Sequence, residues 1–135
     1  MDFVLHTSPS VRPDLERSIR WYEDCLQREK VFHAKQEGER PELLFLEFAK
    51  GQFVELFTNG KTKVQQPPDA IGYQHFCLVV DDLEQALQQL ASVNVYPHRG
   101  PFAGRAQYRI AFISDPDGNI IELMQIQPGS PIYRE

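Results

Sequence analysis

Four polar residues interrupt apolar, strand-like segments of this 135-residue chain, and they constrain its fold more than any other feature. They are two histidines and two glutamates: His6, Glu55, His75 and Glu122. A carboxylate is almost never fully buried unless it is paired with a cation or hydrogen-bonded. The chain must therefore fold so that something compensates these groups.

The surroundings of Glu55 are apolar on both sides. In a strand, Glu55 shares one face with Phe53 and Phe57, while Val54 and Leu56 occupy the other face. A strand of this composition is expected to be covered on both faces. A carboxylate in that position needs a proton or a cation.

The second half of the chain repeats this arrangement. Glu122 lies inside the apolar segment Ile120–Met124, and His75 shares a strand face with Cys77 and Val79. Each half thus has a His near its first strand and a Glu near its last strand, at nearly equal spacing.

Two imidazoles and two carboxylates are suitable ligands for a divalent first-row metal. Taken singly, each His has an alternative interpretation as a hydrogen-bonded core or rim residue, and each Glu as an exposed edge residue. The repetition favours a metal site formed by His6, Glu55, His75 and Glu122.

The first half of the chain predicts a β-α-β-β-β order. A helix is expected over residues 13–26, where Leu15, Ile19, Tyr22 and Leu26 recur at helical spacing. The expected strands are Phe3–Thr7, Lys30–Gln36, Glu42–Phe48 and Gln52–Thr58, the last two turning at Lys50-Gly51.

A polar segment with Gly and Pro separates the halves, and the pattern then restarts. A capping box at Asp82–Gln85 predicts the start of a helix that places Leu83, Leu87 and Leu90 on one face. The expected strands are Gly72–Val80, Val95–His98, Gln107–Ser114 and Asn119–Ile126, with a tight turn at Asp115-Pro-Asp-Gly118 before the last.

These elements predict an α+β chain built as a tandem repeat of about 68 residues. We expect a single domain of 135 residues with module 1 at about 1–58, a linker at 59–71, module 2 at about 72–127 and a tail at 128–135. One βαβββ module cannot bury both faces of its strands alone. Two copies, or two chains, are therefore expected to curve into a mixed β-sheet cup around the metal.

Composition excludes several classes of function. The net charge of −5, with scattered Lys and Arg, gives no basic stripe for nucleic acid. No apolar run approaches the roughly 18 residues of a membrane span. The amino terminus lacks the basic segment followed by an apolar segment that is typical of a signal peptide, so none is expected. Two cysteines without a C-x-x-C pair agree with a reducing compartment, so we expect a cytoplasmic protein.

At this point the sequence resembles the vicinal oxygen chelate superfamily, and most closely its short bacterial glyoxalase I (lactoylglutathione lyase) enzymes. The resemblance spans nearly the whole chain. It is carried by His6-Thr7, Asp14–Tyr22, Val54-Glu-Leu56 followed by Asn59, the strand around His75, and Ala111–Leu123 with its D-P-D-G turn.

The resemblance implies a metal held by the residues His6, Glu55, His75 and Glu122, with open positions for two vicinal oxygens of a substrate. Nickel or cobalt is favoured, with zinc, manganese or iron as alternatives. Glu122 is the expected proton-transferring base, with Glu55 as its partner. The implied reaction converts a hemithioacetal of a 2-oxoaldehyde to a 2-hydroxyacyl thioester through an enediolate, in methylglyoxal detoxification. A homodimer is expected.

Glu55 distinguishes branches of this superfamily, because the resemblance places a different residue there in thiol transferases, dioxygenases and epimerases. Those metal enzymes on the same scaffold remain alternatives, as does a non-catalytic protein that binds a small molecule. His33 and His98 have no carboxylate partner that the sequence assigns, and they are not expected to be ligands.

Two departures concern the thiol of the substrate. An Arg expected shortly after the first His is replaced by Ser8-Pro-Ser-Val11, and an expected Lys is replaced around Phe102–Arg105. The substrate is therefore expected to be an adduct of glutathione or of another low-molecular-weight thiol, or a related oxo or hydroxy acid. The expected substrate contacts are Asn59, Arg105, Phe53, Phe57 and Met124.

The segment Pro97–Ala106 is expected to be a loop. Its glycines permit movement, and Arg99 and Arg105 could meet an anionic substrate. It is predicted either as a lid over the site or as an ordinary surface loop.

Overall fold

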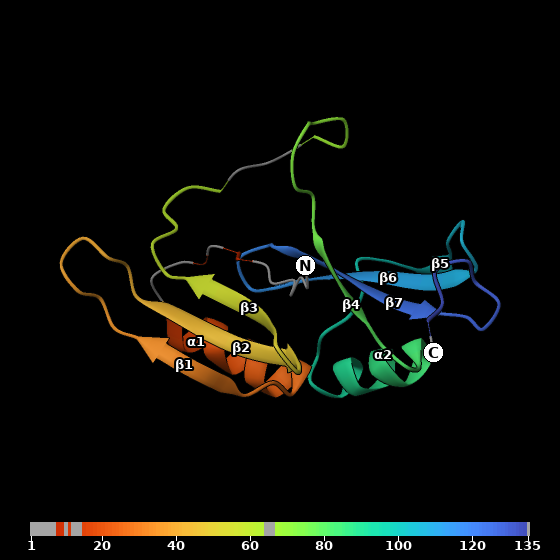
Figure 1. Cartoon of the computed structure of the whole chain (residues 1–135), viewed down its shortest axis with the longest axis horizontal. Helices are drawn as coiled ribbons and strands as arrows, with labels where there is room; N and C mark the ends of the chain where they lie inside the picture. The colour runs from red at the N-terminus through yellow and green to blue at the C-terminus, as the bar shows by residue number, and fades with distance from the viewer. Residues whose placement is uncertain (1–7, 10, 12–14, 64–66, 135) are drawn as a thin grey trace. The chain divides into compact units, whose positions relative to one another are not determined.

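The computed structural model describes residues 8, 9, 11, 15–63 and 67–134. The chain divides into two compact units, Met1–Ala70 and Ile71–Glu135. Each unit is built on a sheet of its own with helical structure beside it (Figure 1). The predicted α+β class is confirmed.

The first unit contains a helix and an antiparallel three-stranded sheet. Helix α1 (Leu15–Arg20) continues into a π-helical turn, η1 (Trp21–Cys25). The strands are β1 (Lys30–Ala34), β2 (Leu43–Ala49) and β3 (Gln52–Phe57), in the order β1-β2-β3. The expected hairpin between β2 and β3 is confirmed, whereas the expected strand Phe3–Thr7 and the first residues of the helix lie outside the described residues.

Alternation along β2 and β3 gives this sheet one deeply buried face. Leu44 and Leu46 of β2 and Val54 and Leu56 of β3 are buried, as is Tyr22 of η1. The residues between them, which include Glu55, occupy the other face and are only partly buried. The core of the unit therefore lies on the side of the sheet away from Glu55.

The second unit has the full βαβββ order. Its elements are β4 (Phe76–Val79), α2 (Leu83–Ser92), β5 (Arg99–Ala103), β6 (Tyr108–Ser114) and β7 (Ile120–Ile126). The sheet order is β4-β7-β6-β5, with β4 parallel to β7 and the other pairs antiparallel. The predicted mixed sheet is confirmed for this unit.

Helix α2 covers one face of the second sheet. The Asp82 side chain caps it by accepting a hydrogen bond from the backbone N–H of Gln85 at 3.0 Å, as the capping box predicts. Leu83 is buried, and its N–H donates to the side chain of Gln125 in β7. Glu122 is three residues before Gln125 in β7, and residues an odd number of positions apart in a strand point to opposite faces. Glu122 therefore lies on the face opposite the helix.

Two predicted strands of this half are corrected. The strand expected over Gly72–Val80 begins only at Phe76, because pairing with β7 starts there and the preceding Ile71 and Tyr73 are exposed. The strand expected at Val95–His98 is wrong. The strand β5 instead occupies Arg99–Ala103, inside the segment expected to be a loop or lid, because that segment pairs with β6.

The turn between β6 and β7 is organised by one carboxylate. Asp115 is buried, and its Oδ1 accepts hydrogen bonds from the backbone N–H groups of Asp117 at 2.9 Å and Asn119 at 2.8 Å. Its Oδ2 accepts from the Asn119 side chain at 2.7 Å. Gly118 closes the turn with a φ of 85°, which a residue without a side chain adopts readily. This turn determines where β7 begins, and therefore where Glu122 lies.

Replacing Asp115 with Ala should lower the free energy of unfolding by about 2 kcal/mol or more, because several donors of a buried turn lose their acceptor. Urea unfolding monitored by circular dichroism measures the change. Asp69→Ala, at an exposed position, is the matched control and should stay within about 0.5 kcal/mol of the parent. Equal effects of the two substitutions would contradict the role assigned to this turn.

Candidate metal centre

One row of side chains crosses the helix-free face of the second sheet. In the strand register, Cys77 of β4 pairs with Glu122 of β7, Glu122 pairs with Phe112 of β6, and Phe112 pairs with Arg99 of β5. Residues paired in this way point to the same face. The row therefore places a thiol, a carboxylate, an aromatic ring and a guanidinium side by side.

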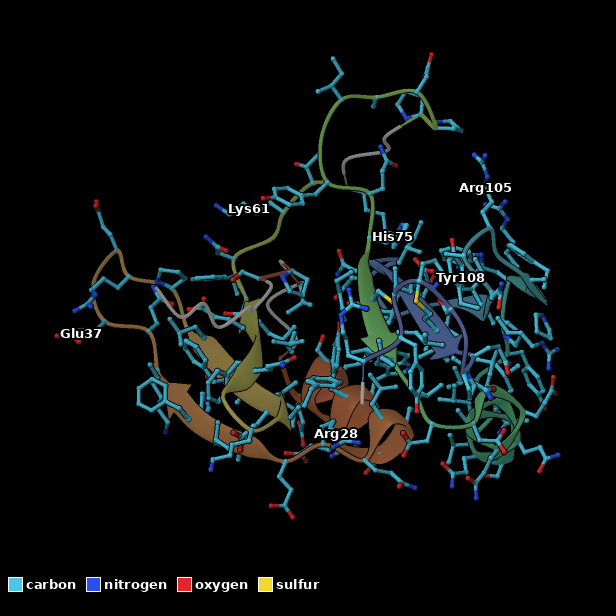
Figure 2. The ribbon with its side chains drawn as sticks, turned by 45° about the vertical axis from the view of Figure 1, so that its right-hand side comes forward. Arg28, Glu37, Lys61, His75, Arg105 and Tyr108 are labelled. Atoms are coloured by element: carbon cyan, nitrogen blue, oxygen red, sulfur yellow. The ribbon has the colours of Figure 1, made fainter. Side chains whose placement is uncertain are left out.

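Glu122 is the buried centre of this row, with 8% of the residue exposed. Its Oε2 lies 2.7 Å from Nε2 of His75. His75 immediately precedes β4 (Figure 2). The ring of Phe112 meets the His75 ring edge to face, with centroids 5.3 Å apart. The imidazole thus supplies the polar partner that a buried carboxylate requires.

The His75 side chain keeps 32% of its surface exposed, against 11% for Glu122. The imidazole therefore reaches solvent while the carboxylate lies beneath it. An oxygen and a nitrogen ligand that converge in this way form half of the predicted ligand set.

Cys77 is paired with Glu122 in the sheet. Desolvation of the thiol, and then the negative charge of Glu122, raise the pKa of Cys77 to about 12. The thiol is therefore protonated at neutral pH.

The first unit carries a similar row. Glu55 of β3 pairs with Phe45 of β2, which in turn pairs with Phe32 of β1. Glu55 Oε2 accepts a hydrogen bond from the Ser8 hydroxyl at 3.1 Å. Phe53, on the same face as Glu55, packs edge to face with Phe45 at a centroid distance of 6.0 Å. The sequence did not single out Ser8 as a partner of Glu55.

The structure brings together some of the predicted residues and leaves others separate. His75 and Glu122 are in contact, and Met124 follows on the same face of β7. Phe53 and Phe57 flank Glu55 on its face of β3. His6 lies outside the described residues.

Two of the expected substrate contacts lie outside the strands. Asn59 is exposed, just beyond the end of β3. Arg105 is exposed in the turn between β5 and β6 (Figure 2). Both remain predictions as substrate contacts.

His33 has a carboxylate partner that the sequence did not assign. Its Nε2 lies 2.7 Å from Glu42 Oε1, with 26% and 31% of the two side chains exposed. The pair joins β1 to the residue just before β2.

The donor chemistry of the described residues agrees with part of a metal site. In the part of the chain that the structure describes, no group of three or more His, Cys, Asp or Glu side chains converges as a metal site would. The His75–Glu122 pair still provides one nitrogen and one carboxylate ligand of the type that binds divalent first-row metals. Two ligands alone do not make a complete metal site of the kind predicted.

Comparison with known proteins decides the family. The model of the Glyoxalase/Bleomycin resistance protein/Dioxygenase superfamily matches residues 4–123. The chain belongs to this superfamily. The resemblance inferred from its sequence motifs is thereby confirmed.

Similar proteins carry lyase names. The chain is 30% identical over 133 residues to a protein named probable lactoylglutathione lyase from Vibrio parahaemolyticus, covering 94% of this chain and 93% of that protein. It is also 30% identical over 125 residues to the lactoylglutathione lyase of Haemophilus influenzae, covering 90% and 91%.

A solved structure of a glyoxalase I variant from Zea mays is similar in fold. It has a TM-score of 0.72 and 27% identity, over 93% of this chain and 45% of that one. These likenesses support a glyoxalase-like function for this chain.

Among the helices of the described residues, none has the length and apolarity needed to span a membrane.

Removing the His75 imidazole should leave the Glu122 carboxylate buried without a partner. In metal-free protein, we expect His75→Ala to lower the free energy of unfolding by about 1–3 kcal/mol. Urea unfolding in the presence of a chelator measures it. The exposed His98 provides the control, since His98→Ala should change the value by less than about 0.5 kcal/mol. A negligible effect of His75→Ala would show that Glu122 does not depend on the imidazole.

Proposed function

We propose that this chain is a metal-dependent lyase of the glyoxalase I type, which converts the hemithioacetal of a 2-oxoaldehyde to a 2-hydroxyacyl thioester. The observation that carries the proposal is the contact of the buried Glu122 carboxylate with His75 at 2.7 Å. The names of the relatives from Vibrio parahaemolyticus and Haemophilus influenzae support the same reaction.

The proposed metal ligands are His6, Glu55, His75 and Glu122. A carboxylate and an imidazole in contact are a suitable pair of ligands for a divalent ion, because a largely buried carboxylate needs a polar or charged partner. The metal is proposed to be nickel or cobalt, with zinc, manganese or iron as alternatives. When bound, such an ion polarises a carbonyl and offsets negative charge that develops on its oxygen.

The proposed role of Glu122 is to move the proton. Its Oε2 contacts His75, which leaves Oε1 to accept a proton from the acidic C–H of the hemithioacetal and to return it to the adjacent carbon. The result is an isomerisation in which no atom is gained or lost. Glu55 is proposed as the partner carboxylate, oriented by the hydroxyl of Ser8 at 3.1 Å.

The apolar residues around the two carboxylates are proposed to exclude water from the reacting carbon. Phe53 and Phe57 flank Glu55, while Phe112 and Met124 lie beside Glu122. Water exclusion strengthens the electrostatic interactions of a site. Asn59 and Arg105 are proposed substrate contacts, and a homodimer is the proposed assembly.

Glu122→Gln tests the base directly. The amide keeps the size of the side chain but cannot accept the proton, so turnover of the methylglyoxal–glutathione hemithioacetal should fall by roughly 10²–10⁴-fold. The assay follows thioester formation after loading with Ni²⁺, Co²⁺, Zn²⁺ or Mn²⁺, and elemental analysis of the same samples reports whether metal is retained.

Full activity of Glu122→Gln would contradict the assignment of the base. Metal binding without turnover in the parent protein would instead favour another metal enzyme on this scaffold, such as an epimerase, thiol transferase or dioxygenase. Ligand binding that survives loss of Glu55 and His75 would favour a non-catalytic binding protein.

A further inference from the structure

The rows of the two units differ at their outer ends. In the first unit the row runs from Glu55 through Phe45 to Phe32. In the second unit the row runs from Glu122 through Phe112 to Arg99. The carboxylate and the central ring are repeated, but the outer aromatic residue is replaced by a cation. The difference requires an explanation specific to the second unit.

A bulge in β5 aims Arg99 at this face. The register between β5 and β6 shifts between Arg99, which pairs with Phe112, and Phe102, which pairs with Ile110. The extra residue puts Arg99 and Phe102 on one face, although an uninterrupted strand would place residues three apart on opposite faces.

Gly100 makes the bulge possible. It has a φ of +83°, and a Cβ there would lie 2.7 Å from the carbonyl oxygen of Ile110. A larger residue would therefore displace the strand on which Arg99 lies.

Two rings hold the Arg99 guanidinium. Its central carbon lies 5.2 Å from the ring centre of Phe102 and 5.4 Å from that of Phe112. Stacking of this kind fixes the plane of a guanidinium and leaves its N–H donors at the edge for a planar acceptor such as a carboxylate.

Arg99 has no acidic partner among the residues that the structure describes. Arg109, by contrast, belongs to the helix-covered side of the same sheet and forms an ion pair with Glu84 of α2 at 2.8 Å. Arg99 is exposed, stacked and available, whereas the charge of Arg109 is already compensated.

The position of Arg99 relative to Glu122 suits a substrate that spans both. Two strand spacings separate their Cα atoms, which corresponds to roughly 10 Å. The ring of Phe112 lies between them and also contacts His75. A molecule whose reacting carbon lies at Glu122 could therefore extend across Phe112 and present an anionic group to Arg99.

We propose that Arg99 determines specificity by binding a carboxylate of the substrate, in the part of the substrate that extends away from the reacting carbon. This inference rests on the proposed function, because it takes the Glu122 site as the place of reaction. It assigns to β5 an anion-binding role within the second unit.

Binding without turnover tests the proposal. The probes are S-methylglutathione, which has two carboxylates, and its dimethyl ester, which has none, and calorimetry measures their affinity for the metal-loaded protein. The parent should bind the free acid at least about tenfold more tightly than the ester. Arg99→Met, which retains an apolar side chain over the rings, should bring the two affinities to within about twofold.

Two further variants separate local binding from net charge and from folding. Arg109→Met removes an equal charge from the other face of the sheet and should keep the preference for the acid. Arg99→Lys keeps the charge and should retain part of the preference. An unfolding midpoint for each variant verifies that it is folded.

The proposal is overturned if the parent does not discriminate between the probes, including by binding neither, or if Arg99→Met discriminates as well as the parent. An equal loss of affinity for acid and ester in Arg99→Met would also overturn it, since that indicates a packing role. Absence of hemithioacetal turnover, with the acid preference present in the parent and lost in Arg99→Met, would contradict the proposed reaction while supporting the anion site.

Discussion

The burial of the Glu122 carboxylate is the constraint on which the second unit depends. A charged group with 8% of its residue exposed requires a partner, and His75 provides one at 2.7 Å. This contact requires β4 to lie beside β7, which the parallel pairing achieves. A parallel pair needs a long connection, which here runs through α2, β5 and β6, and α2 lies on the opposite face of the sheet. The helix-free face therefore remains for the polar row.

The duplication of this arrangement relates the fold to the proposed chemistry. Each unit places a carboxylate next to an aromatic residue of the neighbouring strand, Glu55 beside Phe45 and Glu122 beside Phe112. The two units differ in the residue that contacts the carboxylate and in the residue at the outer end of the row. Ser8 contacts the first carboxylate and His75 the second, and only the second row ends in an arginine.

Local signals predicted much of the fold. The cap of α2 at Asp82 and the turn at Asp115–Gly118 form as their residue types require, because their hydrogen bonds join neighbours in sequence. The first residue of β4 and the position of β5 were mispredicted, because pairing between distant segments and a bulge at Gly100 determine them. The partner of His33 and the row that joins Arg99 to Glu122 could not be predicted from the sequence, because both depend on the register between separate segments of the chain.

The central proposal is that the chain binds one metal ion, with His6, Glu55, His75 and Glu122 as the proposed ligands. Equilibrium titration of the metal-free protein with Co²⁺, followed by the visible absorption of the bound ion, tests it most directly. The account predicts saturation at one ion per chain. Saturation at two ions per chain would show that each half binds its own metal, and no saturable binding would contradict the metal centre altogether.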